Sequence, residues 1–323
     1  MENQRFLVTG SGGCIGAWTV ARLVREGTPV VAFDVSDNDA RLRLLLDDDE
    51  MGRVGTARGD IRDRDRLVDL VTSGRFTHIV HLAGLQVPFC AADPVLGSQV
   101  NVTGTINVLE AVREAAGQVR GMSYASSVAV FGSADLYEEG IAHDESPLAP
   151  ATLYGTYKQA NEGAARVYAA DWEVGSVGLR PCIVYGPGRD QGLTSDVTKA
   201  MLAAAAGREA HIAFGGSSTF QHADDMAATF IEAARLESDT ALIHNVPGPT
   251  VEIEVIASLI EDQTGVEVTV ASDPLPLPRG VDGTPLEEIL GNAATQRPIE
   301  KGIADGIGQF RELLSAGRLQ VGG

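Results

Sequence analysis

Tyr154 and Lys158 have the residue types and the spacing of an acid–base pair. Residues four apart lie on the same face of a helix, one turn from each other. An ammonium group at that distance favours the phenolate, so it lowers the pKa of the tyrosine toward working pH. On spacing alone, a surface Tyr–Lys pair is the commoner explanation. Ser126 and Ser127, however, end the predicted strand before this helix, where a hydroxyl could face the same site.

A second pattern indicates a nucleotide cofactor. Gly10, Gly13 and Gly16 follow the apolar residues 6–8 and precede a segment of helical character, residues 17–25. Strand, glycine-rich turn and helix are the context that a dinucleotide-binding loop requires. The first glycine permits the tight turn, the second lets backbone approach a pyrophosphate, and the third lets helix pack close to strand. The helix N-terminus offers free N–H groups to the phosphates.

Asp34 indicates which dinucleotide is bound. It ends the predicted strand Val30–Asp34, after the glycines, at a distance that suits hydrogen bonds to the adenosine ribose hydroxyls. No arginine follows directly, since the next residues are Val35, Ser36 and Asp37. A 2′-phosphate would meet repulsion there, so we expect NAD rather than NADP.

Strands alternate with helices along the first half of the chain. Strands are predicted over residues 6–8, 30–34, 54–59, 78–83, 121–126 and 174–180, and helices over 17–25, 104–116 and 154–171. This alternation predicts parallel β-α-β units and an α/β fold with a doubly wound parallel sheet, the Rossmann type. Ligands of such sheets bind at the carboxyl ends of the strands.

After residue 180 the alternation loosens. Helices are predicted over residues 196–207, 224–236, 251–265 and 303–316, strands over 209–214, 241–246 and 266–271, and an irregular connector over 273–283. The strand near 241–246 is expected to return to the main sheet. We therefore predict an NAD-binding Rossmann domain over residues 1–180, completed by that strand. Residues 181–323 form mainly a smaller, partly interleaved C-terminal substrate domain.

Composition argues against several classes of partner. With 25 Lys and Arg against 44 Asp and Glu, the net charge of −19 disfavours nucleic acid and anionic membranes. No apolar run reaches the roughly 18 residues that span a bilayer, and the early first strand leaves no room for a signal peptide. Cys14, Cys90 and Cys182 lie far apart and form neither a disulfide framework nor a metal pattern. We expect a cytoplasmic protein with a small-molecule substrate and no metal site.

The order of these motifs resembles that of the extended short-chain dehydrogenase/reductases, the NAD-dependent epimerase/dehydratase family. The similarity covers nearly the whole chain. Its motifs are the glycine loop, Asp34, Asp60 with Ile61, residues 81–84, 101–104 and 125–132, Tyr154 with Lys158, residues 180–187, and a late segment at 222–227.

The resemblance implies a role for each matching residue. Tyr154 would be the general acid/base, Lys158 would lower its pKa and hold the nicotinamide ribose, and Ser127 would bind the reacting oxygen. Asp60 and Ile61 would contact adenine. The other residues implied along NAD are Gly10, Gly13, Cys14, Ile15, Gly16, Asp34, Leu82, Ala83, Gly84, Asn101, Pro181, Ile183 and Val184. Candidate substrate contacts, each of which could equally be packing, are Gln86, Ser127, Cys182, Arg189 and His222.

Three differences from the family's sequence pattern reduce the number of reactions that we expect for this chain. Its 4,6-dehydratases carry an Asp-Glu pair directly after the catalytic hydroxyl residue, where this chain has Val128 and Ala129. Its sugar-nucleotide epimerases usually carry an asparagine a few residues after the arginine matching Arg180, where residues 182–184 contain none. They also carry an arginine before the late aspartates, where residues 216–222 contain none. Two anchors for a nucleotide diphosphate are therefore missing.

The sequence thus predicts an NAD-dependent oxidoreductase that transfers hydride at a secondary alcohol or ketone of a small sugar, polyol or hydroxy acid. The alternative is an NAD-dependent sugar or sugar-nucleotide epimerase with tightly held NAD, which would use the same catalytic residues. A non-catalytic NAD(H)-sensing or scaffold protein is disfavoured by the intact Ser127, Tyr154 and Lys158. The resemblance also implies a homodimer, formed by the Tyr154 helix and the helix over 104–116 as a four-helix bundle.

Overall fold

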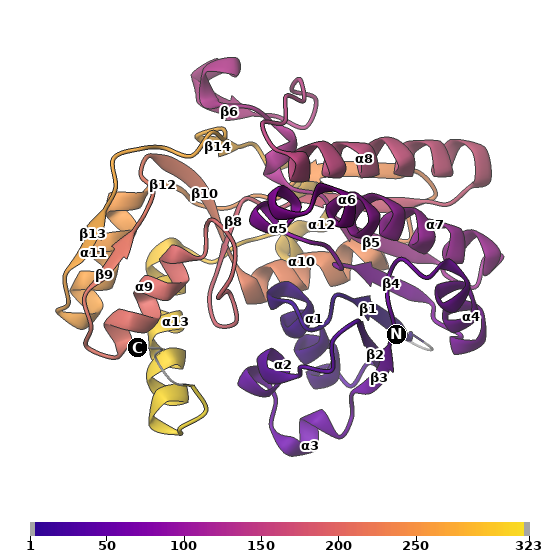
Figure 1. The fold of residues 1–323 in the computed structure, drawn as a ribbon, viewed down its shortest axis with the longest axis horizontal. Helices are drawn as coiled ribbons and strands as arrows, with labels where there is room; N and C mark the ends of the chain where they lie inside the picture. The colour runs from indigo at the N-terminus through magenta and orange to yellow at the C-terminus, as the bar shows by residue number, and fades with distance from the viewer. Residues whose placement is uncertain (1–3, 320–323) are drawn as a thin grey trace.

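A seven-stranded parallel sheet forms the centre of the protein (Figure 1). The computed structural model describes residues 4–319. The strands stand in the order β11-β7-β5-β4-β1-β2-β3, and every neighbouring pair is parallel. They are β1 (Phe6–Thr9), β2 (Val30–Asp34), β3 (Gly55–Arg58), β4 (His78–His81), β5 (Gly121–Ala125), β7 (Ser176–Arg180) and β11 (Ala241–Asn245). The strand order reverses between β1 and β4, which confirms the doubly wound sheet and marks where a ligand binds.

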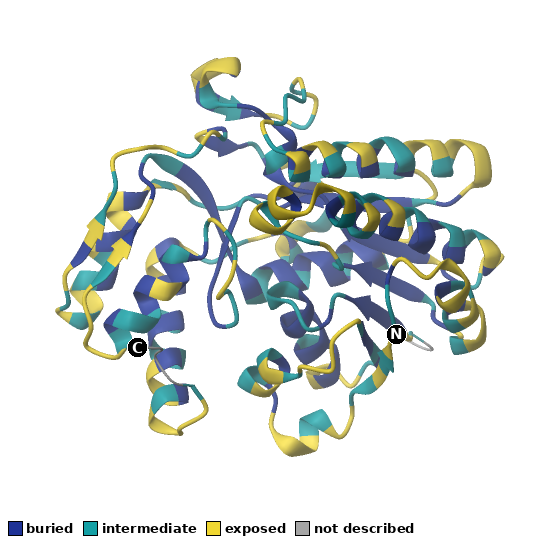
Figure 2. Cartoon of the chain, in the orientation of Figure 1, coloured by how far each residue is buried: buried dark blue, intermediate teal, exposed yellow. Residues whose placement is uncertain are grey.

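Helices cover both faces of this sheet. They are α1 (Cys14–Arg25), α4 (Arg64–Gly74), α7 (Gly104–Glu114), α8 (Leu153–Trp172), α10 (Ala223–Arg235) and α12 (Thr284–Leu290). Successive residues of a strand point to opposite faces. Phe6 and Val8 accordingly pack in one core with α1 and α10, and Leu7 packs in another with α4 and α7. Because both faces of β1 and β4 are buried (Figure 2), these central strands read in the sequence as largely apolar runs, whereas the edge strand β3 is partly exposed.

Shorter elements join these layers. They are α2 (Ala40–Leu45), α3 (Asp48–Met51), α5 (Val87–Ala92), α6 (Pro94–Ser98), a π-helical turn at Gln99–Thr103, and 3₁₀ turns at Val128–Val130, Ala134–Leu136, Glu138–Gly140 and Gly291–Ala293. Two short strands, β6 (Ile141–Ala142) and β14 (Gly280–Val281), pair in parallel.

A second hydrophobic core lies beside the sheet, on the left of Figure 1. Its elements are β8 (Ile183–Tyr185), α9 (Asp196–Ala205), β9 (Ala210–Ile212), β10 (Ser217–His222), β12 (Thr250–Glu252), α11 (Ile253–Thr264), β13 (Val268–Val270) and α13 (Ile299–Ser315). A three-stranded sheet β12-β10-β8 and the pair β13-β9 contribute to it. Within residues 4–319, no helix is long and apolar enough to cross a membrane.

The second half of the chain contributes more to the main sheet than the sequence predicts. Strand β11 pairs with β7, as expected. Helix α10 also packs on this sheet, where its buried Phe230 and Ile231 join the core of α1. Strand β8 is a difference, because the prolines and glycines at positions 181, 186, 187, 188 and 192 predict a long loop there. Pro181 and Gly186 bracket its three buried residues, and only pairing with β10 reveals them as a strand. The division of the chain at residue 180 stays a prediction.

Candidate active site

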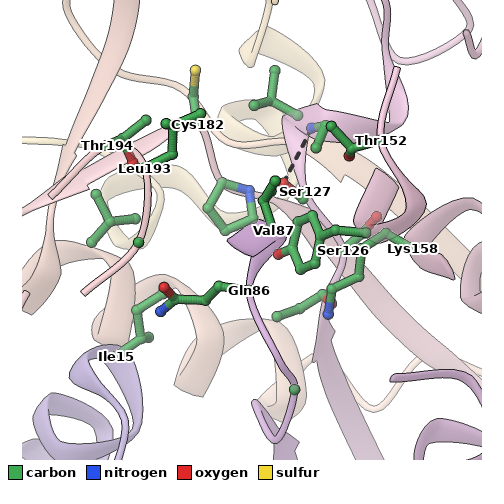
Figure 3. A pocket seen from close by; sticks show the side chains of 18 of the residues that line it. Ile15, Gln86, Val87, Ser126, Ser127, Thr152, Lys158, Cys182, Leu193 and Thr194 are labelled. Carbon is green, nitrogen blue, oxygen red and sulfur yellow. Dashed lines mark hydrogen bonds between the residues drawn. The ribbon is translucent and has the colours of Figure 1, made fainter. Parts of the chain in front are cut away.

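A pocket of about 260 Å³ opens at the carboxyl ends of β1, β4 and β5 (Figure 3). The glycine loop, the start of α1, the loop after β4 and the start of α8 form its wall on the sheet side. Residues 192–194 and 275–277 close it from the second core. The predicted site residues that line it are Gly10, Gly13, Cys14, Ile15, Gly16, Leu82, Gly84, Gln86, Ser127, Tyr154, Lys158, Pro181, Cys182, Val184 and Arg189.

The glycine loop has the geometry that a dinucleotide requires. Gly10 has φ +69°, and a Cβ there would lie 2.5 Å from the Ala83 nitrogen. A Cβ on Gly16 would lie 2.2 Å from the Gly10 carbonyl oxygen, so neither position accepts a side chain. Gly13 caps α1 without a side-chain hydrogen bond, and the first turn holds no acidic residue. The free N–H groups of this helix end therefore fit a pyrophosphate.

Asp34 lies at the end of β2, next to the glycine loop. Its Oδ2 accepts a hydrogen bond from the Gly12 nitrogen at 3.0 Å, and its Oδ1 accepts one from the Ser36 nitrogen at 3.0 Å. These bonds hold a half-buried carboxylate at the edge of the loop. Asp60 is paired with Arg62 at 2.6 Å, and the hydrogen bond from this guanidinium lowers the pKa of the carboxyl.

Several predicted cofactor residues lie outside the lining of this pocket. Asp34, Asp60, Ile61, Ala83, Asn101 and Ile183 do not line it. Asn101 is buried, and its Oδ1 accepts a hydrogen bond from the Leu85 nitrogen while its Nδ2 donates to the Leu85 and Gly97 oxygens. It thereby holds the loop that carries Gln86. Ile183 is fully buried in β8 and belongs to the second core.

Ser127, Tyr154 and Lys158 meet at the junction of β5 and α8. The Ser127 Oγ accepts a hydrogen bond from the Ala129 nitrogen at 3.1 Å, so the hydroxyl is fixed in the turn after β5. The Lys158 Nζ donates to the Ala125 carbonyl oxygen at 2.6 Å and lies 5.5 Å from the centre of the Tyr154 ring. Figure 3 shows Ser127 and Lys158 on one side of the pocket and Leu193 and Thr194 on the other.

Burial dominates the electrostatics of this group. Burial raises the pKa of Tyr154, and the groups that lower it are the Ser127 hydroxyl and the Arg189 guanidinium. Burial lowers the pKa of Lys158 to about 8. Burial is the largest cause of both shifts. That Lys158 lowers the pKa of Tyr154 stays a prediction.

The candidate substrate residues separate into two groups. Gln86, Ser127, Cys182 and Arg189 line the pocket. His222 does not; it is buried at the start of α10, where its Nδ1 accepts a hydrogen bond from the Asp224 nitrogen at 3.2 Å. Its ring packs edge-on against Trp18 and Tyr185. His222 is therefore placed as a helix cap, away from the pocket.

Several other residues that line the pocket are not predicted from the sequence. Thr152 accepts a hydrogen bond from the Gly155 nitrogen at 3.0 Å as the N-cap of α8, a position that a threonine before a helix could have indicated. Leu275 and Leu277 lie in the proline-rich connector, where no periodicity marks them. In the described part of the chain, the charged side chains that line the pocket are Lys158 and Arg189.

Comparisons with known proteins agree with this architecture. The model of the NAD dependent epimerase/dehydratase family matches residues 6–246. The UDP-glucose 4-epimerase of Mycolicibacterium smegmatis is 30% identical over 237 residues, which are 71% of this chain and 73% of that protein. Several other curated relatives are matched over only 40% to 60% of their own length.

Solved structures share the fold over almost the whole chain. The UDP-glucose 4-epimerase of Thermus thermophilus, in complex with NAD, is 25% identical with a TM-score of 0.79, over 95% of this chain and 99% of that one. The L-threonine dehydrogenase of Clostridium difficile has a TM-score of 0.82 at 18% identity, over 96% of this chain and 98% of that one. At that identity, the second likeness concerns the fold alone.

Proposed function

The chain belongs to the NAD-dependent epimerase/dehydratase family, and from this membership we propose an oxidoreductase that acts on a small molecule. It transfers hydride at a secondary alcohol or ketone of a small sugar, polyol or hydroxy acid. The observation that carries this proposal is the scarcity of cations around the reacting groups. Among the described lining residues, Lys158 and Arg189 are the charged ones. A nucleotide diphosphate normally requires several charge-assisted hydrogen bonds.

The glycine loop, the start of α1 and Asp34 would hold NAD, the cofactor of this family. When bound, NAD accepts the hydride from the substrate or returns it. The pocket continues from the glycine loop to Ser127 and Tyr154, so one cavity would hold both the part of NAD next to this loop and the reacting oxygen.

Tyr154 would exchange the proton with the substrate oxygen, and Ser127 would hold that oxygen. Burial raises the pKa of Tyr154, and the hydrogen bond between Ser127 and the phenol and the positive charge of Arg189 oppose that rise. Both favour proton release toward working pH, as a general base requires. Lys158 is buried and already donates to the Ala125 oxygen, so it is held in place beside the Tyr154 ring.

The second candidate function is an epimerase that keeps its NAD through the reaction. The 30% identity with a UDP-glucose 4-epimerase favours it. An epimerase oxidises and then reduces its substrate, so NADH does not accumulate. The two candidates therefore differ in their net redox balance rather than in their catalytic residues.

A cofactor-reduction screen tests the proposal. Purified protein is incubated with NAD or NADP and with sugars, polyols, hydroxy acids or UDP-sugars, while NADH absorbance and product are followed in parallel. We expect NADH to rise in proportion to the oxidised product of a small substrate. Conversion of a UDP-sugar to its epimer without net NADH would establish the second candidate instead.

We also propose a homodimer and a cytoplasmic location. Leu153, Val167 and Trp172 are apolar residues of α8 that stay between 43% and 49% exposed, which supports pairing through this helix. Size-exclusion chromatography with light scattering should give twice the chain mass, and Val167→Glu should give the monomer. The location is supported by Cys14, Cys90 and Cys182, which are all free thiols.

A further inference from the structure

Two arginines from separate elements reach the start of α1. Arg41, on α2, donates from Nη1 to the Gly12 oxygen at 2.7 Å. Arg189 lies on the loop that follows β8. Together with Gly13, Cys14 and Gln86, both arginines line a second cavity of about 210 Å³. This cavity shares Gly13, Cys14, Gln86 and Arg189 with the active-site pocket, so the two are continuous.

Each of the two guanidinium groups has one N–H donor without a hydrogen-bond partner among the described residues. Arg41 Nη2 pairs with Asp190 at 2.6 Å, and Arg189 Nη2 donates to the Thr194 hydroxyl at 3.1 Å. The Nε atoms of both arginines are buried and have no partner in the described part of the chain. An unpaired buried donor is costly, so each guanidinium carries an uncompensated N–H group beside the wall of this cavity.

Independent support comes from Cys14, the first residue of α1. Burial raises the pKa of its thiol to about 12, and the positive charges of Arg189 and Arg41 are the groups that oppose this rise. Both charges therefore act on the helix end that carries the free N–H groups. The chain as a whole is strongly acidic, so this is a local positive site in a negative field.

We propose that Arg41 and Arg189 clamp the pyrophosphate of the bound dinucleotide against the N-terminus of α1. This inference rests on the proposed function, because it takes NAD as the ligand. It moves Arg189 from the substrate to the cofactor. Lys158 is then the charged side chain left at the substrate end of the pocket.

The clamp also connects the two parts of the protein. Arg41 belongs to the sheet side, whereas Arg189 and Asp190 belong to the loop that leads to α9. The Arg41–Asp190 ion pair therefore links both sides across the pyrophosphate site. Opening of this loop to release the cofactor would break the ion pair, so we expect the pair to slow release.

The test measures binding of ADP-ribose, which contains the pyrophosphate, and of adenosine, which lacks it. Isothermal titration calorimetry is carried out on the wild type, Arg41→Met and Arg189→Met. We expect each substitution to weaken the affinity for ADP-ribose by about 10- to 100-fold, because each removes a charge-assisted hydrogen bond. The affinity for adenosine should stay within twofold of the wild-type value. Arg189→Lys should recover part of the loss. Arg43→Met is the matched control, since Arg43 lies on the same helix but pairs with Asp39 at the surface.

Asp190→Asn provides a kinetic readout. It removes the Arg41 ion pair without removing either arginine, so NADH dissociation followed by stopped-flow fluorescence should become several-fold faster. Unchanged ADP-ribose affinity in Arg189→Met, with a raised substrate KM, would make Arg189 a substrate anchor and overturn the clamp. An equal loss of affinity for adenosine and for ADP-ribose would also overturn the clamp, because it would mean that the substitution disrupts the fold of the loop that carries Arg189. If the wild type bound neither NAD nor ADP-ribose, the proposed function itself would fail.

Discussion

Glu162 and Arg180 form a doubly hydrogen-bonded ion pair inside the protein. Arg180 Nε donates to Glu162 Oε1 at 2.8 Å and Nη2 donates to Oε2 at 2.9 Å, with side chains 1% and 0% exposed. Ser126 donates to the same Oε1 at 2.6 Å. Glu162 stands one turn after Lys158, and Ser126 directly precedes Ser127. The pair therefore fixes the lysine of α8 relative to the serine after β5.

Glu162→Gln should destabilise the protein strongly. It leaves the Arg180 charge buried without its counter-ion, a change that typically costs about 3–5 kcal/mol. The free energy of unfolding, measured with urea, should fall by that amount. Asp39→Asn is the control, because Asp39 pairs with Arg43 at the surface and should change stability by less than about 1 kcal/mol. A loss below about 1 kcal/mol in Glu162→Gln would contradict this account of the pair.

Tyr154→Phe should remove turnover but keep the cofactor. Without the phenolic oxygen there is no group to exchange the proton, so the rate should fall by about 100- to 10,000-fold. NAD affinity should change little. Tyr157→Phe is a matched control on the same helix, since its hydroxyl donates to the Pro94 oxygen at 2.9 Å and does not line the pocket. Equal activity in both variants would exclude Tyr154 as the acid/base.

Lys158→Met should stabilise the protein while it inactivates it. Burial lowers the pKa of Lys158 from 10.5 to about 8, which corresponds to about 3 kcal/mol of unfavourable ammonium burial. The lost hydrogen bond to the Ala125 oxygen offsets about 1 kcal/mol of the gain. Thermal unfolding at pH 7 should therefore show a higher Tm for the variant.

The pH dependence of this gain follows from the two protonation states. Below pH 8 the lysine is charged in both the folded and the unfolded protein, so the whole penalty applies to the wild type. Between pH 8 and 10.5 the folded state has released its proton and the unfolded state has not, so wild-type stability rises relative to the variant. The difference in Tm should shrink across this interval. A constant difference would mean that the gain comes from packing instead.

Asp34→Asn should reduce the preference of the enzyme for NAD over NADP. The carboxylate stands where the glycine loop and β2 meet, and it would repel a 2′-phosphate. We expect the wild type to prefer NAD to NADP by at least about 100-fold in kcat/KM, and the variant to lose most of that preference. Asp37→Asn is a suitable control, because Asp37 forms an exposed ion pair with Arg58. An unchanged ratio in Asp34→Asn would remove Asp34 from the ribose site.

The features that the sequence predicts correctly depend on residues that are close together in the chain. The central strands β1 and β4 are buried on both faces, so they appear as largely apolar runs. The glycines are required by close approaches such as that between Gly16 and the Gly10 oxygen. Tyr154 and Lys158 are one turn apart on one helix. These features depend on neighbours in the sequence, and the fold class and family predicted from them are confirmed.

The remaining features depend on contacts between distant segments. Nothing near Arg41 indicates that it reaches Gly12, and nothing near Leu275 indicates that it closes a pocket. His222 has the chemistry of a substrate ligand, but its ring is buried against Trp18 and Tyr185, which are distant in the sequence. The pKa shifts of Lys158 and Tyr154 depend on burial, which helical spacing does not reveal.

Trp18 lies where its intrinsic fluorescence can report on the loop that carries Arg189. Its indole Nε1 donates to the Pro187 oxygen at 2.9 Å, and Pro187 begins the loop that carries Arg189. The chain has two tryptophans, and Trp172 lies far along α8 with 44% of its surface exposed. After Trp172→Phe, intrinsic emission comes from the indole that touches this loop. With ADP-ribose, which lacks the nicotinamide that absorbs tryptophan emission, a change in this emission would report on the surroundings of the loop without any attached dye.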